Sequence, residues 1–118
     1  MDRTLTLQVP AEDPGATPEE VAREWAPCLR ALGDETRLQL ALLLAERPRS
    51  VKDLQEATGL TQPLVSHHLR TLREGGVVTV RAEGRRNVHD LCCAELIDVV
   101  RCLASLATAN AAADIEPG

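Results

Sequence analysis

Aromatic side chains are almost absent from this chain of 118 residues: Trp25 is the only one, and there is no Tyr or Phe. Proteins that read single-stranded nucleic acid stack its bases on aromatic platforms, so the composition argues against that class. The core has to be built from Leu, Val and Ala, which favours helices packed on helices. The length corresponds to one domain.

Other signals are missing as well. No apolar run approaches the ~20 residues of a membrane span, and no signal-peptide core follows Met1. We therefore expect a cytoplasmic protein with no membrane partner, whose four cysteines are reduced thiols. No two cysteines form a C-x-x-C pair, which argues against a zinc finger or a thioredoxin-like site. P-loop, G-x-S-x-G and H-E-x-x-H motifs are absent, so we expect no enzyme.

Positive charge is scarce overall but concentrated in one stretch. The net charge is -5, yet residues 59–86 carry five arginines against two glutamates and include His67 and His68. Those arginines are Arg70, Arg73, Arg81, Arg85 and Arg86. Clustered cations are typical of surfaces that bind phosphate groups. A merely solvated face is the alternative, and the structure that the stretch adopts decides between the two.

Capping residues and breakers divide the middle of the chain into four helices. We expect the helices to begin after Thr17, Asp34, Ser50 and Thr61. We expect them to end near Gly33, Pro48, Gly59 and Gly75. Pro27 should kink or split the first helix, because proline lacks the N–H that the helix needs.

After residue 76 the hydrophobic period changes. Residues 77–81 predict a strand, 82–85 a turn and 86–91 a second strand. The helical period resumes at Cys92 or Cys93 and ends before Pro117. We expect a tail at 1–16 with an extended piece at 5–9, one domain at 17–109, and a second tail at 110–118.

The order of helix, glycine turn, helix and basic hairpin predicts a winged helix-turn-helix, a mainly α fold with a two-stranded β-wing. Val65 and Leu69 should face the core, which leaves the opposite face of their helix free to enter a major groove. The candidate DNA-binding residues are polar or basic: Thr61, Gln62, Ser66, His67, Arg70, Arg73 and, on the hairpin, Arg85 and Arg86. A helix pair and hairpin that merely pack together are the alternative.

Six segments within roughly residues 28–106 form a further pattern: 31–38, 53–54, 59–62, 65–73, 75–78 and 83–85. In these segments the chain resembles the ArsR/SmtB family of bacterial repressors. This resemblance covers most of the chain. It implies a homodimer formed through the first and last helices, which binds double-stranded operator DNA when unliganded and releases it on binding an effector. Composition agrees with a dimer, because the apolar residues of these two helices exceed what one small core can cover. They are Trp25, Leu29, Leu96, Val99, Leu103 and Leu106.

Family members that sense metals carry ligands at known places, and this chain departs from them. The stretch 49–53 has no thiol, and one pair of ligand positions on the last helix falls on Leu106 and Ala109, which cannot bind a metal. The remaining candidates for a thiophilic metal or metalloid ion are Cys92, Cys93 and Cys102.

An intact helix would place Cys93 and Cys102 about 180° apart. A site would therefore need an unwound helix start or thiols from both protomers. Packing is the alternative for Cys93, as it is for Cys28. His89 and Asp90 are a weaker candidate pair for nickel or zinc.

We therefore interpret the sequence as a sequence-specific DNA-binding repressor controlled by an effector, with a metal or metalloid ion as one candidate. Two alternatives stay open. One is a winged-helix module that binds another protein, using its acidic termini. The other is a regulator without a metal effector that a partner protein controls.

Overall fold

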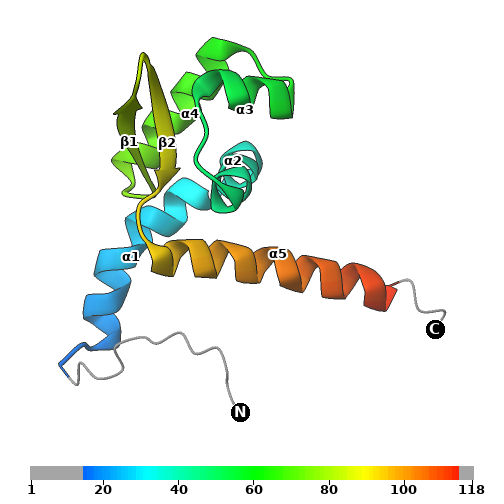
Figure 1. Ribbon diagram of the computed structural model, residues 1–118. Helices are drawn as coiled ribbons and strands as arrows, with labels where there is room; N and C mark the ends of the chain where they lie inside the picture. The colour runs from blue at the N-terminus through cyan, green and yellow to red at the C-terminus, as the bar shows by residue number, and fades with distance from the viewer. Residues whose placement is uncertain (1–14, 115–118) are drawn as a thin grey trace.

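The computed structural model describes residues 15–114, and of residues 108–114 it describes the backbone alone. The described chain forms five helices and one hairpin (Figure 1). They are α1 (Pro18–Leu32), α2 (Glu35–Glu46), α3 (Val51–Thr58), α4 (Gln62–Glu74), β1 (Val78–Glu83), β2 (Arg86–Leu91) and α5 (Ala94–Asp114). The extended piece expected at residues 5–9 lies outside the described residues.

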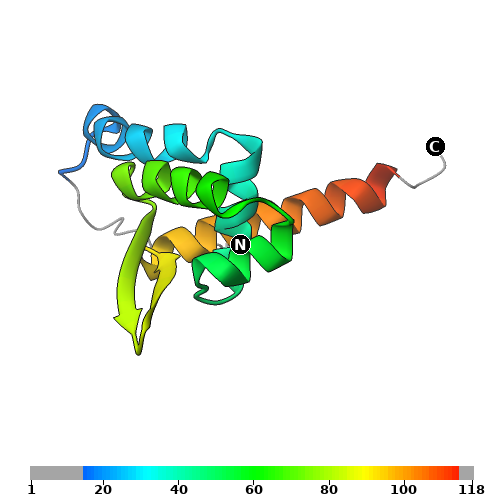
Figure 2. The same ribbon diagram turned by 90° about the horizontal axis from the view of Figure 1, so that it is seen from above.

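The elements divide into a head and two projecting helices. The hairpin, α2, α3 and α4 make up the head, while α5 and the beginning of α1 extend away from it (Figure 1). Seen from above, α1 lies alongside α4 (Figure 2), and the two helices are in contact. The fold class expected from the sequence is confirmed.

Three of the four predicted helix caps are present. Thr17 accepts a hydrogen bond from the backbone N–H of Glu20 at 3.1 Å. Asp34 accepts one from Arg37 at 3.1 Å. Ser50 and Asp53 form a reciprocal capping box, with distances of 3.1 and 3.0 Å. These bonds satisfy N–H groups that a helix start leaves unpaired.

The fourth predicted cap is wrong in one respect. Thr61 stands at the N-cap position of α4, but its side chain makes no capping hydrogen bond. Pro63 occupies the second helical position and has no N–H, which removes one of the two groups that an N-cap side chain normally accepts from.

Pro27 does not split α1, which continues through it to Leu32. The carbonyl oxygen of Arg23, four residues earlier, loses its helical partner. Arg23 is exposed, so water can take that place. Burial of Cys28, Ala31 and Leu32 holds the second half of the helix against the head.

α2 lies at the centre and packs against α1, α4, α5 and β2. Leu40 and Ala41 are fully buried on it, and Leu44 nearly so. The largest fully buried side chains are all Leu or Val, as the composition predicted: Leu40, Leu44, Leu54, Leu69, Leu72, Leu96, Val65, Val77, Val78 and Val100.

The hairpin pairs Val78 with Leu91 at its base and Glu83 with Arg86 at its tip. Its turn is the two residues Gly84–Arg85, shorter than the expected turn at 82–85, because β1 continues through Glu83. Gly84 has a φ of 68°, and a two-residue hairpin turn favours glycine for that reason. An isolated β-bridge between Arg49 and His89 joins the hairpin to the α2–α3 link.

α5 begins at Ala94, so Cys92 and Cys93 precede the helix and do not belong to it. The helix reaches Asp114 and so ends before Pro117, as expected. The alanine-rich composition of this segment favours helix, since alanine has the highest helix propensity.

Within residues 15–114, none of the helices has the length and apolar character to cross a membrane.

Candidate DNA interface

α3 and α4 form a helix pair joined by a sharp turn at Gly59. Gly59 has a φ of 80°, a left-handed conformation that favours glycine, and its N–H donates to the carbonyl of Gln55. The hydroxyl of Thr58 donates to the Leu54 carbonyl at 2.7 Å and accepts from the Leu60 N–H at 3.1 Å. These bonds fix the angle at which α4 leaves the turn.

One face of α4 anchors the helix and the opposite face is open to solvent. Val65, Leu69 and Leu72 are buried. Most of the predicted DNA-binding residues of this segment are exposed: Thr61, Gln62, His67, Arg70 and Arg73. Ser66 is half-buried. The arrangement is the one expected of a helix that enters a major groove.

The first turn of α4 already holds a hydrogen bond between two of these residues. Gln62 Nε2 donates to Ser66 Oγ at 2.9 Å, which orients the amide along the helix. Leu64 is also exposed here, at 41%. The sequence analysis did not include it among the candidates, although an apolar side chain is able to touch a thymine methyl group.

The arginines of the wing are not equivalent. Arg85 lies in the turn, is exposed, and makes no ion pair with any described residue. Arg86 pairs with Asp53 of α3 at 3.6 Å. Arg81 pairs with Glu83 at 3.5 Å and with Asp90 at 3.8 Å. Local composition could not reveal these partners.

The adjacent residues His67 and His68 of α4 do not form a metal site. His67 is exposed, whereas His68 is half-buried, with its Nδ1 enclosed and without a hydrogen-bond partner. On β2, His89 is buried and Asp90 pairs with Arg81, because neighbouring strand residues face opposite sides. Burial lowers the pKa of His89. The weaker nickel or zinc pair at 89–90 is therefore not assembled.

Two adjacent thiols, Cys92 and Cys93, lie between β2 and α5, and the buried Cys28 of α1 is their neighbour. Cys92 Sγ lies 3.2 Å from Cys93 Sγ. Desolvation and the hydrogen bond to Cys93 raise the pKa of the Cys92 thiol. Burial and the neighbouring Cys93 raise the pKa of Cys28 on α1. Cys102 is exposed further along α5.

This arrangement changes the candidate set for a thiophilic ion. Cys28 was considered only as a packing residue, and it is indeed buried, but it also lies close enough to Cys92 and Cys93 to act on their charge. Among the side chains that the structure describes, residues 15–107, no three Cys, His, Asp or Glu are arranged as a metal site. The donor set is therefore a pair of adjacent thiols with no third ligand in place.

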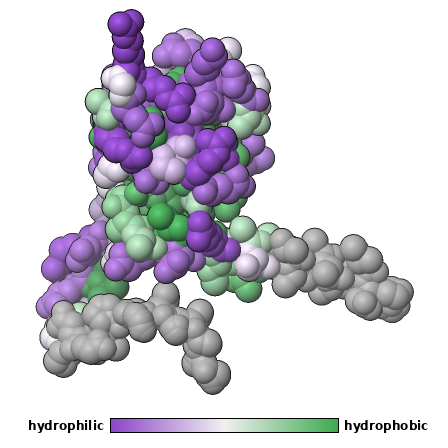
Figure 3. Space-filling view, in the orientation of Figure 1, coloured by the Kyte–Doolittle hydropathy of each residue, from purple (hydrophilic) through white to green (hydrophobic). Residues whose placement is uncertain are grey.

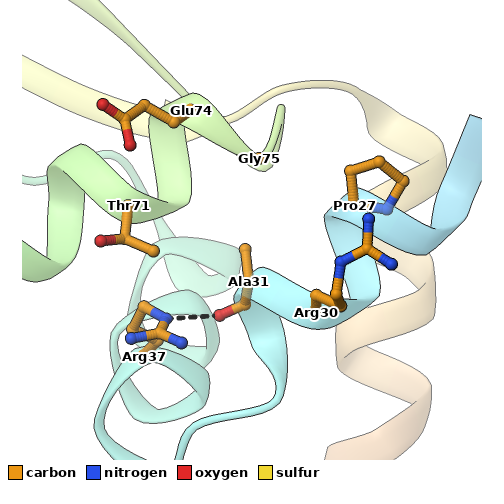
Figure 4. A pocket seen from close by; sticks show the side chains of 7 residues that line it. All are labelled: Pro27, Arg30, Ala31, Arg37, Thr71, Glu74 and Gly75. Carbon is orange, nitrogen blue, oxygen red and sulfur yellow. Dashed lines mark hydrogen bonds between the residues drawn. The ribbon is translucent and has the colours of Figure 1, made fainter.

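A pocket of about 350 Å³ lies between α1, the start of α2 and the end of α4 (Figure 4). Arg37 Nε donates to the Ala31 carbonyl there at 2.6 Å. At its edge α1 and α4 approach so closely that a Cβ on Gly75 would lie 2.7 Å from the Ala31 Cβ. No predicted DNA-binding residue lines this pocket.

Most of the exposed large apolar residues of the described chain lie on α1 and α5, and the two exceptions are Leu64 on α4 and Val80 on β1. Figure 3 shows a hydrophilic head above an apolar region near α1 and α5. On these two helices six large apolar side chains are exposed by 36% or more: Val21, Trp25, Leu29, Val99, Leu103 and Leu106. Leu96, expected with them, is buried in the protomer's own core.

Comparison with known proteins gives a consistent result. Residues 34–80 match the model of the bacterial regulatory protein family arsR. The transcriptional repressor SmtB of Mycobacterium tuberculosis is 37% identical over 74% of this chain, and the match covers 64% of its own length. A probable mercury resistance operon repressor of Streptomyces lividans is 38% identical over 80% of this chain and 75% of its own.

A solved structure agrees with these relatives. The homodimeric winged helix-turn-helix DNA-binding domain from Mycobacterium bovis superposes with a TM-score of 0.68 at 28% identity, over 80% of this chain and 89% of that one. The resemblance drawn from the sequence motifs is confirmed. The chain belongs to the arsR family of bacterial regulatory proteins.

Proposed function

We propose that the protein is a transcriptional repressor that binds operator DNA as a homodimer. The observation that carries the proposal is the separation of two surfaces on one small fold. An exposed polar and basic face on α4 lies beside the wing, and an exposed apolar face lies on α1 and α5. On this proposal the protein is a regulator and not an enzyme, and it acts in the cytoplasm, where the DNA is.

On this proposal Thr61, Gln62, Ser66 and His67 face base edges near the first turns of α4. Arg70 and Arg73 reach a base or the adjacent phosphates, since arginine serves both. Arg85 at the wing tip contacts the flanking backbone. The names of the relatives support this role, because both are described as repressors.

The homodimer rests on the apolar face. Six exposed large side chains on two helices leave a surface that a second copy can cover, and the related domain from Mycobacterium bovis is homodimeric. Two-fold symmetry would then place two copies of α4 on successive turns of one DNA face.

The test is selection of bound duplexes from a random-sequence pool, followed by binding assays at several salt concentrations. We expect a pseudo-palindrome whose half-sites lie about 10–10.5 base pairs apart, or a multiple of this. Gln62→Ala should weaken binding, while Gln39→Ala, an exposed glutamine on α2, should not. Recovery of no preferred sequence, with binding insensitive to salt, would instead favour a protein-interaction module.

The effector is the second part of the proposal. A soft metal or metalloid ion suits thiol ligands, and one relative is named for mercury resistance. Cys92 and Cys93 are the donors best placed for it, with Cys28 as their neighbour. Adding mercury(II), arsenite, cadmium or zinc to the preformed DNA complex tests this. If none releases the DNA, the effector is of another class, such as a partner protein.

A further inference from the structure

Besides the apolar packing of the hairpin against α2 and α4, two polar contacts join β2 to the α2–α3 link and to α3. The first is the β-bridge: the Arg49 N–H donates to the His89 carbonyl at 3.0 Å, and the His89 N–H donates to the Arg49 carbonyl at 2.7 Å. Both residues are buried. Arg49 is also held from the other side, because its guanidinium donates to the Leu43 carbonyl and to Glu46. The bridge therefore fixes the middle of β2 to the α2–α3 link.

The second contact lies nearer the wing tip, where Arg86 begins β2. Its guanidinium is 3.6 Å from the carboxylate of Asp53 in the first turn of α3. Asp53 cannot move freely, because its carboxylate also accepts from the Ser50 N–H in the capping box. That hydrogen bond, with further contributions from Ser50, Arg86 and Arg47, lowers the pKa of Asp53.

We propose that Arg86 is a positioning residue: its pairing with Asp53 sets the angle of the wing relative to α4, and Arg85 alone supplies the wing's phosphate contact. This inference rests on the proposed DNA-binding function. It assigns different roles to Arg85 and Arg86, two adjacent arginines that the sequence analysis predicts as equivalent DNA contacts. Arg85 points its charge to solvent without an acidic partner among the described residues, whereas the charge of Arg86 is already matched.

The geometry explains why a half-exposed ion pair can matter here. Such pairs usually contribute little, because two flexible side chains must be ordered to form them. In this case Asp53 is already ordered by the capping box, and the middle of β2 is already held by the Arg49–His89 bridge. Only the Arg86 side chain therefore has to be ordered when the pair forms. The pair lies nearer the wing tip than the bridge does, so it restrains the part of the wing that is free to tilt.

Asp53→Asn gives the sharpest test, because the two readings predict opposite signs. Asparagine keeps an oxygen for the Ser50 N–H but loses the charge that faces Arg86. If Arg86 positions the wing, DNA binding weakens by about two- to five-fold, the range expected for loss of one such pair. If Arg86 is a phosphate contact restrained by Asp53, removal of the acid strengthens binding and raises the salt slope by about one.

Asp34→Asn is the matched control. Asp34 likewise caps a helix through its carboxylate, and no described contact joins it to the wing. Its variant should leave the DNA affinity unchanged. The double variant Asp53→Asn/Arg86→Gln should bind no more weakly than either single variant. Arg85→Ala, in contrast, should lower the salt slope by about one, while Arg86→Gln leaves it unchanged.

Hydrogen exchange in the free protein separates this inference from the proposed function. Asp53→Asn and Arg86→Gln should both speed amide exchange in residues 78–91, and Arg85→Ala should not. Faster exchange in a protein that binds no DNA would support the positioning role of Arg86 and refute the proposed repressor function. Unchanged exchange, or a salt slope lowered by Arg86→Gln, would overturn the positioning role and leave the proposed repressor function intact.

Discussion

Gly75, just after α4, offers a test of how closely α1 and α4 pack. Its φ of -84° and ψ of 1° suit any residue, so alanine would ordinarily stabilise the protein by about 0.4–1 kcal/mol through the unfolded chain. Here the added Cβ would lie 2.7 Å from the Ala31 Cβ and 3.1 Å from the Pro27 carbonyl oxygen. Overpacking of this kind costs about 1–3 kcal/mol. We expect a net loss of about 1–2 kcal/mol.

Urea unfolding followed by circular dichroism measures this loss. The midpoint should fall while the slope with denaturant stays the same. Protein concentration must be held constant, because dimerisation contributes to stability. Gly33→Ala is the control, since its Cβ would meet only two carbonyl oxygens at 3.4 Å, and its midpoint should hold or rise.

A second variant locates the strain. Ala31→Gly removes the nearest atom and should restore part of the stability in the Gly75→Ala background, although glycine itself costs about 1 kcal/mol in a helix. The packing argument fails if Gly75→Ala unfolds at the same or a higher urea concentration than the wild type.

Four further predictions follow from the other sites. Gln62→Ala should cost about 1–3 kcal/mol at one base position and relax specificity there, measured on operator variants; an equal loss on all sequences would make Gln62 a backbone contact. Leu103→Asp should give a monomer by sedimentation, and a persistent dimer would place the interface elsewhere. Because the pKa of His89 is lowered by burial, stability should fall as the pH drops below about 6.5, the unfolded value, and His89→Gln should flatten that dependence in urea titrations. If mercury(II) or arsenite releases the DNA, Cys92→Ser and Cys93→Ser should abolish the response and Cys102→Ser should not, which gel-shift titration would show.

The sequence predicted the elements of the fold well, because their signals are local. α4 runs over the expected residues Gln62–Glu74, and β2 over the expected 86–91. Capping residues and glycines act on the residues next to them, so spacing alone reveals them. Thr61 occupies the predicted N-cap position of α4, but Pro63, two residues later, has no N–H for the Thr61 side chain to accept from.

What the sequence could not predict depends on contacts between distant residues. The pairing of Arg86 with Asp53 requires the wing to fold back onto α3. The proximity of Cys28 to Cys93 requires α1 to lie close to the segment between β2 and α5. Neither follows from periodicity, which gives the inner face of each element but not the residue that it meets.

The single tryptophan gives this protein a built-in optical reporter. Trp25 lies on the apolar face of α1, and no other side chain of the chain absorbs or emits as an aromatic fluorophore. Its emission therefore reports on the environment of that one helix and does not report on the leucine and valine core. Association would move it to shorter wavelength as a second copy excludes water. Assembly can then be followed by fluorescence and loss of helix by circular dichroism, as two independent signals from the unlabelled protein.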